Sequence, residues 1–291
     1  MSKAKNPSPI YADIGVNFQG RFDYTTDEII AYAKKNLVRA MISITNDTRD
    51  IEKNVTLAKK YPGTIMCTIG VHPHNAKFLT DKKFAEMTYI IERNVGNGKK
   101  IVCAIGECGL DYNRMNSSKS LQLKWFRAQI NLATKLHLPL YMHCRDAFND
   151  FTGVMEDSGF NGKKIVHCFT GDSKELFYFL DNGYHIGITG WITQQNKNKD
   201  GIAKNHRLIE AITMLKDDCD RLKKFMSRVM IETDSPWLVP HNLEGPRQKT
   251  NYPENVHYVC KALSGMLGMT HEALARITYK NSLSFFRSTN V

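Results

Sequence analysis

Apolar residues recur along the chain in short runs, separated by longer amphipathic stretches. The short runs are rich in β-branched and apolar residues and are bounded by Gly, Pro or polar residues, a pattern typical of strands. They predict eight strands, at residues 11–16, 40–44, 64–70, 101–106, 138–142, 164–166, 184–188 and 228–231. The amphipathic stretches predict helices between them, at residues 26–36, 50–61, 81–94, 118–137, 147–158 and 173–182. In the first of these, Thr26 is the expected N-cap, with acids in the first turn and lysines in the last.

This alternation predicts an α/β fold, a (β/α)8 TIM barrel, for which about 250 residues is typical. A doubly wound open sheet is the alternative, but eight regular units and the lack of a Gly-rich phosphate fingerprint count against it. No linker or low-complexity stretch divides the 291 residues. We therefore expect a single domain over residues 1–291, with its core at 10–286 after a short polar N-terminal extension. Polar stretches at 194–204 and 241–251 predict long loops after the seventh and eighth strands.

Composition narrows the class of protein. No stretch approaches the run of about 18 apolar residues that spans a bilayer, and the polar N-terminus lacks the apolar segment of a secretory signal. The seven cysteines are odd in number and include no CxxC pair, which favours a reducing compartment. We expect a cytoplasmic protein with no membrane partner, with the nucleus as the alternative location. The sequence leaves the oligomeric state open.

The net charge is +11, from 40 Lys and Arg against 29 Asp and Glu. A field of this sign attracts a polyanion and raises its rate of encounter. A basic surface that is merely solvated is the alternative, because many of the lysines lie on predicted helix faces. Charge alone therefore does not establish a nucleic-acid partner.

Four residues with metal-binding side chains follow predicted strands: Glu107, His143, His167 and Asp234. The active sites of parallel barrels lie at the C-terminal ends of the strands. Imidazole nitrogens and carboxylate oxygens are the usual protein ligands of catalytic divalent metals. A single histidine after a strand is more often structural, but four such residues at one end of one sheet predict a metal site built from strands four, five, six and eight.

The same regions carry a family resemblance. The segments that carry it are DIGVN (13–17), GVHPH (70–74), IGECGLDYNR (105–114), PLYMHCRDAF (139–148), HCFTG (167–171), IGITGW (186–191) and IETDSPWL (231–238). In this order they resemble the TatD-type metal-dependent deoxyribonucleases, a branch of the amidohydrolase-like barrels. The resemblance implies hydrolysis of phosphodiester bonds in DNA, with RNA as an alternative substrate, by a metal-activated water.

The resemblance also implies roles for individual residues. Glu107, His143, His167 and Asp234 are the expected metal ligands, and Asp234 and Glu107 are the expected catalytic residues. The residues expected to bind substrate are His72, His74, Arg114 and Arg145, where a guanidinium suits bidentate contact with phosphate. Trp191 and Trp237 are candidates for stacking on an unpaired base.

Strand one departs from the pattern of many family members. Their Asp-x-His-x-His motif, which holds a second metal, reads Asp13-Ile-Gly-Val-Asn17 here, without either histidine. The expected cofactor is therefore one or two divalent cations per chain, with Glu107 as a bridge and Asn17 or waters completing the weaker position. Mg²⁺, Mn²⁺ and Zn²⁺ all remain candidates.

Two other functions stay open. The first is metal-dependent hydrolysis of an ester or amide, such as deacylation of a D-aminoacyl-tRNA, which would make tRNA the partner. The second is a non-enzymatic binding protein, suggested by the missing histidines of strand one. Neither the choice between exonuclease and endonuclease nor that between single and double strands can be made from the sequence.

Overall fold

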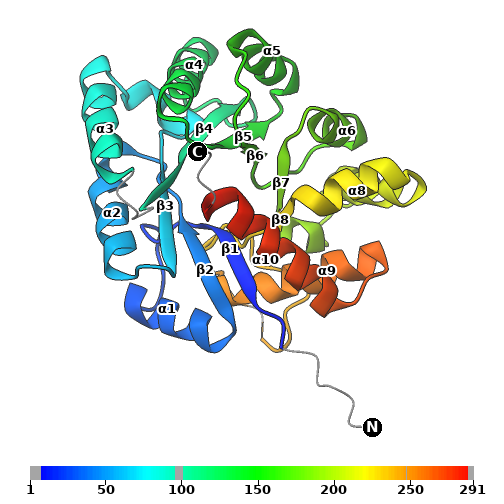
Figure 1. Cartoon of the computed structure of the whole chain (residues 1–291). Helices are drawn as coiled ribbons and strands as arrows, with labels where there is room; N and C mark the ends of the chain where they lie inside the picture. The colour runs from blue at the N-terminus through cyan, green and yellow to red at the C-terminus, as the bar shows by residue number, and fades with distance from the viewer. Residues whose placement is uncertain (1–7, 96–100, 247, 288–291) are drawn as a thin grey trace.

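The computed structural model describes residues 8–95, 101–246 and 248–287, and within them the strands form one parallel sheet in the order β1 to β8. Each strand pairs in parallel with the next. The sheet closes between β1 and β8, where Val16 bridges to Ser235 and the Asn17 N–H donates to the Ser235 carbonyl at 2.8 Å. The predicted TIM barrel is confirmed (Figure 1).

The strands are β1 (Tyr11–Val16), β2 (Val38–Ser43), β3 (Ile65–Ile69), β4 (Val102–Asp111), β5 (Leu140–Arg145), β6 (Lys164–Val166), β7 (His185–Ile188) and β8 (Val229–Ile231). The helices are α1 (Thr26–Lys35), α2 (Ile51–Lys60), α3 (Asp81–Asn94), α4 (Lys119–Leu136), α5 (Phe148–Ser158), α6 (Ser173–Asp181), α7 (His206–Met214), α8 (Cys219–Arg228), α9 (Val256–Leu267) and α10 (His271–Arg287). Short 3-10 helices include η2 (Pro73–Phe78) and η3 (Gly190–Thr193).

All eight predicted strands and all six predicted helices are present, with shifted ends. The largest shift is in β4 and β5, whose ladder continues to the pair Asp111–Arg145. Glu107 and His143 therefore lie inside strands, not after them. The predicted cap Thr26 was wrong: Thr25 caps α1 by accepting the Glu28 N–H, and the Glu28 carboxylate accepts the Thr25 N–H in return. Helices α7 to α10 were not predicted.

Two apolar clusters follow from the alternation of side chains in the barrel strands. The larger one lies between the sheet and the helices. The smaller one lies inside the barrel and includes Ile14, Tyr141 and Met230 together with Phe285 and Phe286 of α10. Helix α10 therefore closes the N-terminal end of the barrel, where Figure 1 shows it crossing the strands. The interior is packed, and the opposite end is left for a site.

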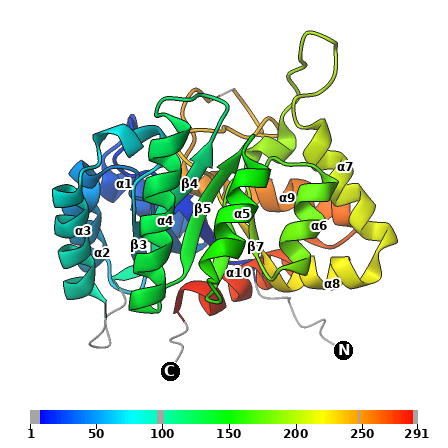
Figure 2. The same cartoon turned by 90° about the horizontal axis from the view of Figure 1, so that it is seen from above.

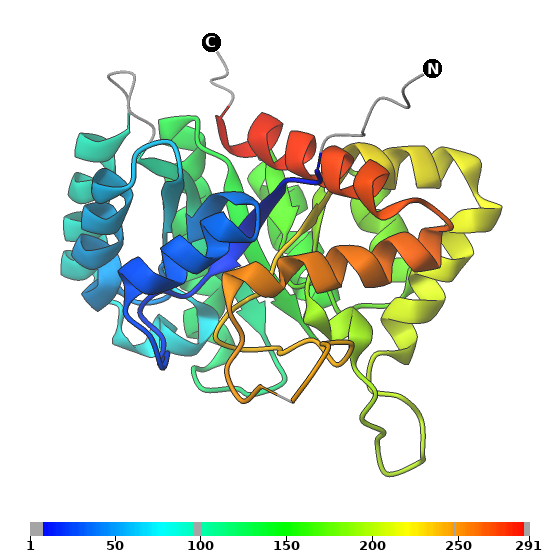
Figure 3. The same cartoon turned by 90° about the horizontal axis from the view of Figure 1, so that it is seen from below.

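The predicted loops after β7 and β8 extend from that opposite end. Figures 2 and 3 show the loop after β7 on the side of the molecule away from α10. The stretch at 194–204 contains the antiparallel bridge between Lys197 and Ala203. The stretch at 241–251 forms no helix or strand in the residues that the structure describes, which exclude residue 247. Residues 1–7 of the predicted N-terminal extension also lie outside the described residues. Of the helices described, none has the length and apolar character to cross a bilayer.

Candidate metal centre

Glu107 occupies a β-bulge at the mouth of the barrel. The register of β4 against β5 shifts between Ile105 and Cys108, so three steps along β4 match two along β5. Such bulges re-aim side chains next to active sites. Gly106 is required here: its φ is +147°, and a Cβ would lie 2.0 Å from the Tyr141 carbonyl oxygen. The bulge is thus a backbone feature that only glycine permits, and it directs Glu107 inward.

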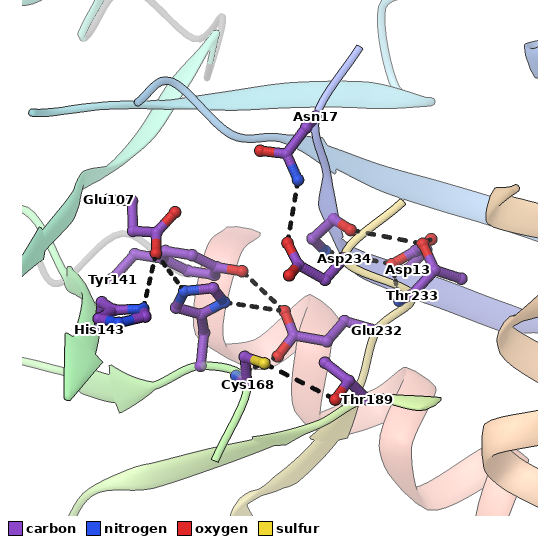
Figure 4. A network of polar contacts seen from close by, with 12 residues as sticks. Asp13, Asn17, Glu107, Tyr141, His143, Cys168, Thr189, Glu232, Thr233 and Asp234 are labelled. Atoms are coloured by element: carbon purple, nitrogen blue, oxygen red, sulfur yellow. Dashed lines mark hydrogen bonds and ion pairs between the residues drawn. The ribbon is translucent and has the colours of Figure 1, made fainter. Parts of the chain in front are cut away.

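Three imidazoles converge on one oxygen of that carboxylate. Oε1 of Glu107 lies 2.6 Å from His167 Nε2, 3.1 Å from His143 Nδ1 and 3.2 Å from His72 Nε2. Glu107 is 3% exposed, so these contacts are shielded from solvent. Figure 4 shows Glu107, His143 and Asp234 around a common space. The predicted meeting of strands four, five and six at one point is therefore a feature of the structure.

His72 is placed differently from the other two histidines. Its Nδ1 accepts the His74 N–H at 3.0 Å, so in the neutral ring Nε2 carries the proton and donates to Glu107. Burial lowers the pKa of His72 to about 4, which keeps the ring neutral. His72 thus presents an N–H donor to the site, although its distance alone would suit a metal ligand.

Asp234 approaches from β8 through a backbone turn. Its φ is 53°, in the left-handed region, and its side-chain Oδ1 accepts the Asn17 amide at 2.9 Å. The Asn17 Oδ1 accepts in turn from Asn46 at 2.7 Å. Burial raises the pKa of Asp234 to about 7, with the charges of Glu107 and Glu232 adding to it. Asn17 therefore orients Asp234.

His143 and His167, two of the expected ligands, each contact a second carboxylate that sequence reasoning missed. His143 Nε2 lies 3.1 Å from Asp111 Oδ2, and His167 Nδ1 lies 3.5 Å from Glu232 Oε2. The signal was present in the sequence, because Asp111 in GLDY and Glu232 in VMIE are acids within apolar strand sequences. Both are at most 1% exposed.

These contacts shift the pKa values of the site. Burial disfavours charge on Glu107, but the positive charge of His167 and the hydrogen bonds from His143 and His167 outweigh it and leave the Glu107 pKa well below its usual value. Burial also opposes charge on His167, but the carboxylates of Glu107 and Glu232 raise the His167 pKa well above its usual value. The pKa of His143 is raised by its hydrogen bonds to Asp111 and Glu107 despite burial. The site thus holds negative charge that cations stabilise.

The site opens into a cavity of about 520 Å³. Its lining includes every predicted site residue: His72, His74, Glu107, Arg114, His143, Arg145, His167 and Asp234, and with them Trp191 and Trp237. Within the described residues, the guanidinium groups of Arg114 and Arg145 form no ion pair, although Asp111 and Asp146 are near them in sequence. His74 Nε2 instead contacts Asp111 at 2.8 Å. Trp237 is 59% exposed.

The donor set fits a divalent cation. Ligand atoms of His72, Glu107 and His143 all lie within 4.8 Å of one another, and His167 Nε2 contacts the same Glu107 oxygen. Two imidazoles and two carboxylates suit Zn²⁺ or Mn²⁺ by ligand type, and Mg²⁺ when phosphate oxygens complete the shell. A ring nitrogen that carries a proton cannot bind a metal ion, so His72 Nε2 is not expected to be a ligand. The expected set is therefore Glu107 and His143 with His167 and Asp234.

The chain is similar to proteins of one known family over nearly its whole length. The family model "TatD related DNase" matches residues 12–287. The 3'-5' ssDNA/RNA exonuclease TatD of Erwinia billingiae is 32% identical over 279 residues, which cover 94% of this chain and 98% of that protein. The protein of the same name from Salmonella typhimurium is 31% identical over 278 residues, with coverages of 94% and 98%.

Solved structures show the same architecture. A TatD family hydrolase from Entamoeba histolytica superposes with a TM-score of 0.81 at 25% identity, covering 97% of this chain and 99% of its own. An uncharacterized amidohydrolase from Saccharomyces cerevisiae shares the fold with a TM-score of 0.75 at 20% identity, covering 96% and 100%. With the family match over nearly the whole chain, the protein belongs to the TatD-related DNase family.

Proposed function

We propose that this protein is a divalent-metal-dependent nuclease that hydrolyses phosphodiester bonds from the 3' end of single-stranded DNA or RNA. The polarity and the substrate are those named for its relatives from Erwinia and Salmonella. The observation that carries the proposal is the convergence of His143 and His167 on the buried carboxylate of Glu107, at the floor of a cavity that Arg114 and Arg145 line.

Glu107, His143, His167 and Asp234 are the proposed ligands. A divalent ion held there supplies a Lewis acid that lowers the pKa of a water ligand and offsets charge on phosphoryl oxygens. Asn17 fixes one oxygen of Asp234 by a 2.9 Å hydrogen bond, which orients the other toward the cavity that Asp234 lines. That oxygen is the proposed acceptor of the proton from the attacking water. Glu107 holds the imidazoles in place and would be a ligand of the same ion.

Substrate contacts come from the walls of the cavity. His72 presents an N–H donor that suits a phosphate oxygen, because its other nitrogen is already bonded to the His74 backbone. Arg114 and Arg145 line the cavity without an ion-pair partner among the described residues, so their donors are available for a phosphodiester. His74 is held by Asp111 and is proposed to contact substrate less directly.

The test uses the purified protein with a 5'-labelled single-stranded oligonucleotide and Mg²⁺ or Mn²⁺. A ladder shortened from the 3' end is expected, and EDTA is expected to stop it. Glu107→Ala and Asp234→Asn should reduce cleavage by about 10²-fold or more, the usual loss when a metal ligand or general base is removed. Glu86→Ala, an exposed acid on α3, is the matched control and should cleave normally.

Two outcomes would contradict the proposal. Unchanged cleavage by both site variants, with the fold confirmed by circular dichroism, would remove the metal centre from the reaction. Equal cleavage of circular DNA and of oligonucleotides blocked at the 3' end would keep the nuclease but refute the 3' exonuclease assignment.

A further inference from the structure

One buried carboxylate at the barrel centre is not explained by metal binding or by substrate contact. Glu232 directly follows β8, is 0% exposed, and is not among the residues that line the cavity. A buried acid is costly unless its oxygens are satisfied by hydrogen bonds. The position of Glu232 therefore requires a structural or positioning reason.

The contacts of Glu232 are divided between its two oxygens. Oε1 accepts the Cys168 N–H at 2.5 Å, and Oε2 accepts the Tyr141 hydroxyl at 2.7 Å. Oε2 also lies 3.5 Å from Nδ1 of His167, the one ion-pair contact that this nitrogen makes within the described residues. Figure 4 shows Glu232 joined to Tyr141 in this network. The carboxylate thus contacts the His167 ring, the backbone N–H of the next residue and the Tyr141 hydroxyl. The Tyr141 ring itself stacks on His167, with 4.6 Å between the ring centroids.

The barrel makes room for this carboxylate with two glycines. A Cβ on Gly15 of β1 would lie 2.4 Å from Glu232 Oε2, and a Cβ on Gly187 of β7 would lie 2.4 Å from Oε1. Strands on either side of β8 in the closed barrel therefore lack side chains where the carboxylate sits. Any larger residue at either position would displace Glu232 or the strand.

We infer that Glu232 is a positioning residue that fixes His167 with its proton on Nδ1 and its Nε2 lone pair facing the metal ligands. This inference rests on the proposed metal-dependent function. The two ring nitrogens of His167 face opposite partners, Glu107 on the cavity side and Glu232 on the interior side. Both nitrogens face a carboxylate, but an ion held beside Glu107 would take the Nε2 lone pair, so the remaining ring proton would be on Nδ1, facing Glu232.

The isosteric change Glu232→Gln reverses that preference. If the amide oxygen keeps the Cys168 N–H, the amide NH₂ takes the place of Oε2 and donates toward His167 Nδ1. The Nδ1 must then accept, and the proton moves to Nε2, where it blocks coordination. Loss of such an outer partner typically weakens metal binding by about 10–100-fold.

The experiment measures Zn²⁺ affinity by isothermal titration, without substrate, for wild type, Glu232→Gln and Tyr141→Phe. Tyr141→Phe is the matched control, because it removes another hydrogen bond from the same Glu232 oxygen but keeps the ring that stacks on His167. Zn²⁺ binding by Glu232→Gln should fall by about 10–100-fold, while Tyr141→Phe should bind as wild type does. A structural role alone would weaken both variants alike.

A second measurement observes the wild-type protein and does not depend on Glu232→Gln or Tyr141→Phe folding. In ¹⁵N-histidine-labelled wild type loaded with Zn²⁺, a downfield proton coupled to Nδ1 is expected, assigned by its absence from His167→Gln. A proton on Nε2 instead, wild-type affinity in Glu232→Gln, or equal losses in both variants would overturn the inference and leave the nuclease assignment intact. Wild type that binds no Zn²⁺, Mn²⁺ or Mg²⁺ would refute the proposed metal centre itself.

Discussion

Asp13 is a buried acid outside the proposed metal ligands, and its protonation can be tested through the pH dependence of folding stability. It lies in β1, is 0% exposed, and accepts the Thr233 and Gly15 N–H groups on Oδ1 at 2.9 and 3.2 Å. Its Oδ2 lies 2.6 Å from the Thr233 hydroxyl. Burial raises the pKa of Asp13 well above its usual value, more than those hydrogen bonds lower it. We therefore expect Asp13 to keep its proton in the folded protein at pH values where the unfolded chain has lost it.

The consequence is a pH-dependent stability. The unfolded chain releases the Asp13 proton near pH 3.9, whereas the folded protein retains it. The contribution of Asp13 to folding is therefore full below about pH 3.9 and is lost as pH rises toward the raised folded pKa. Asp13→Asn is neutral in both states, so wild type should lose stability relative to this variant by up to about 1.4 kcal/mol for each pH unit in that window.

The assay is urea unfolding at several pH values between 4.5 and 7, at constant ionic strength, for wild type, Asp13→Asn and Asp13→Ala. Every other titrating group is common to the three proteins and cancels in the differences. Asp13→Ala should be about 1–3 kcal/mol less stable than Asp13→Asn, because buried N–H groups lose their acceptor, and that gap should not vary with pH. Parallel curves for wild type and Asp13→Asn would show that Asp13 is ionised in the fold, and would refute the reasoning.

Two further predictions concern packing and substrate contact. Gly187→Ala should destabilise the protein by about 1–3 kcal/mol, because its Cβ would lie 2.4 Å from Glu232; Gly153→Ala on α5, with no atom within 4 Å of its Cβ, should stabilise it by about 0.5–1 kcal/mol. Thermal unfolding checks both variants, and a change in stability of the same sign in both would contradict the packing argument. Trp237→Ala should weaken single-stranded DNA binding by about 1–3 kcal/mol, as measured by fluorescence anisotropy. Tyr89→Ala, similarly exposed on α3, should bind normally, and equal losses would remove stacking as the explanation.

The fold was largely predictable from local pattern. The eight apolar runs and the amphipathic stretches between them are recognised from residues close together in the chain. The strands and most helices could therefore be placed without knowing what they pack against. The ends of β4 and β5 could not, because the ladder that extends them to Asp111 and Arg145 depends on pairing between segments about thirty residues apart. Thr25 was missed as a cap because Thr25 and Thr26 are alike in sequence and only backbone geometry distinguishes them.

The candidate site divides in the same way. The sequence shows which residues have metal-binding side chains and that they follow apolar runs: Glu107, His143, His167 and Asp234. In the structure these residues and His72 line one cavity. Their roles as ligands stay a prediction until metal binding is measured. The bulge that turns Glu107 inward arises from register against β5, which local pattern does not contain.

The sequence by itself determined the alternation of strands and helices, the family, and the residue types that can hold a metal. Only the tertiary structure decided which atom of each side chain faces which partner. Glu232 contacts Tyr141 from 91 residues away, and Asp13 contacts Thr233 across 220 residues. Such contacts exist only because the barrel closes β1 against β8. A histidine tautomer or the protonation of a buried acid depends on that closure, since both are set by the atoms in direct contact with the group and not by its neighbours in the chain.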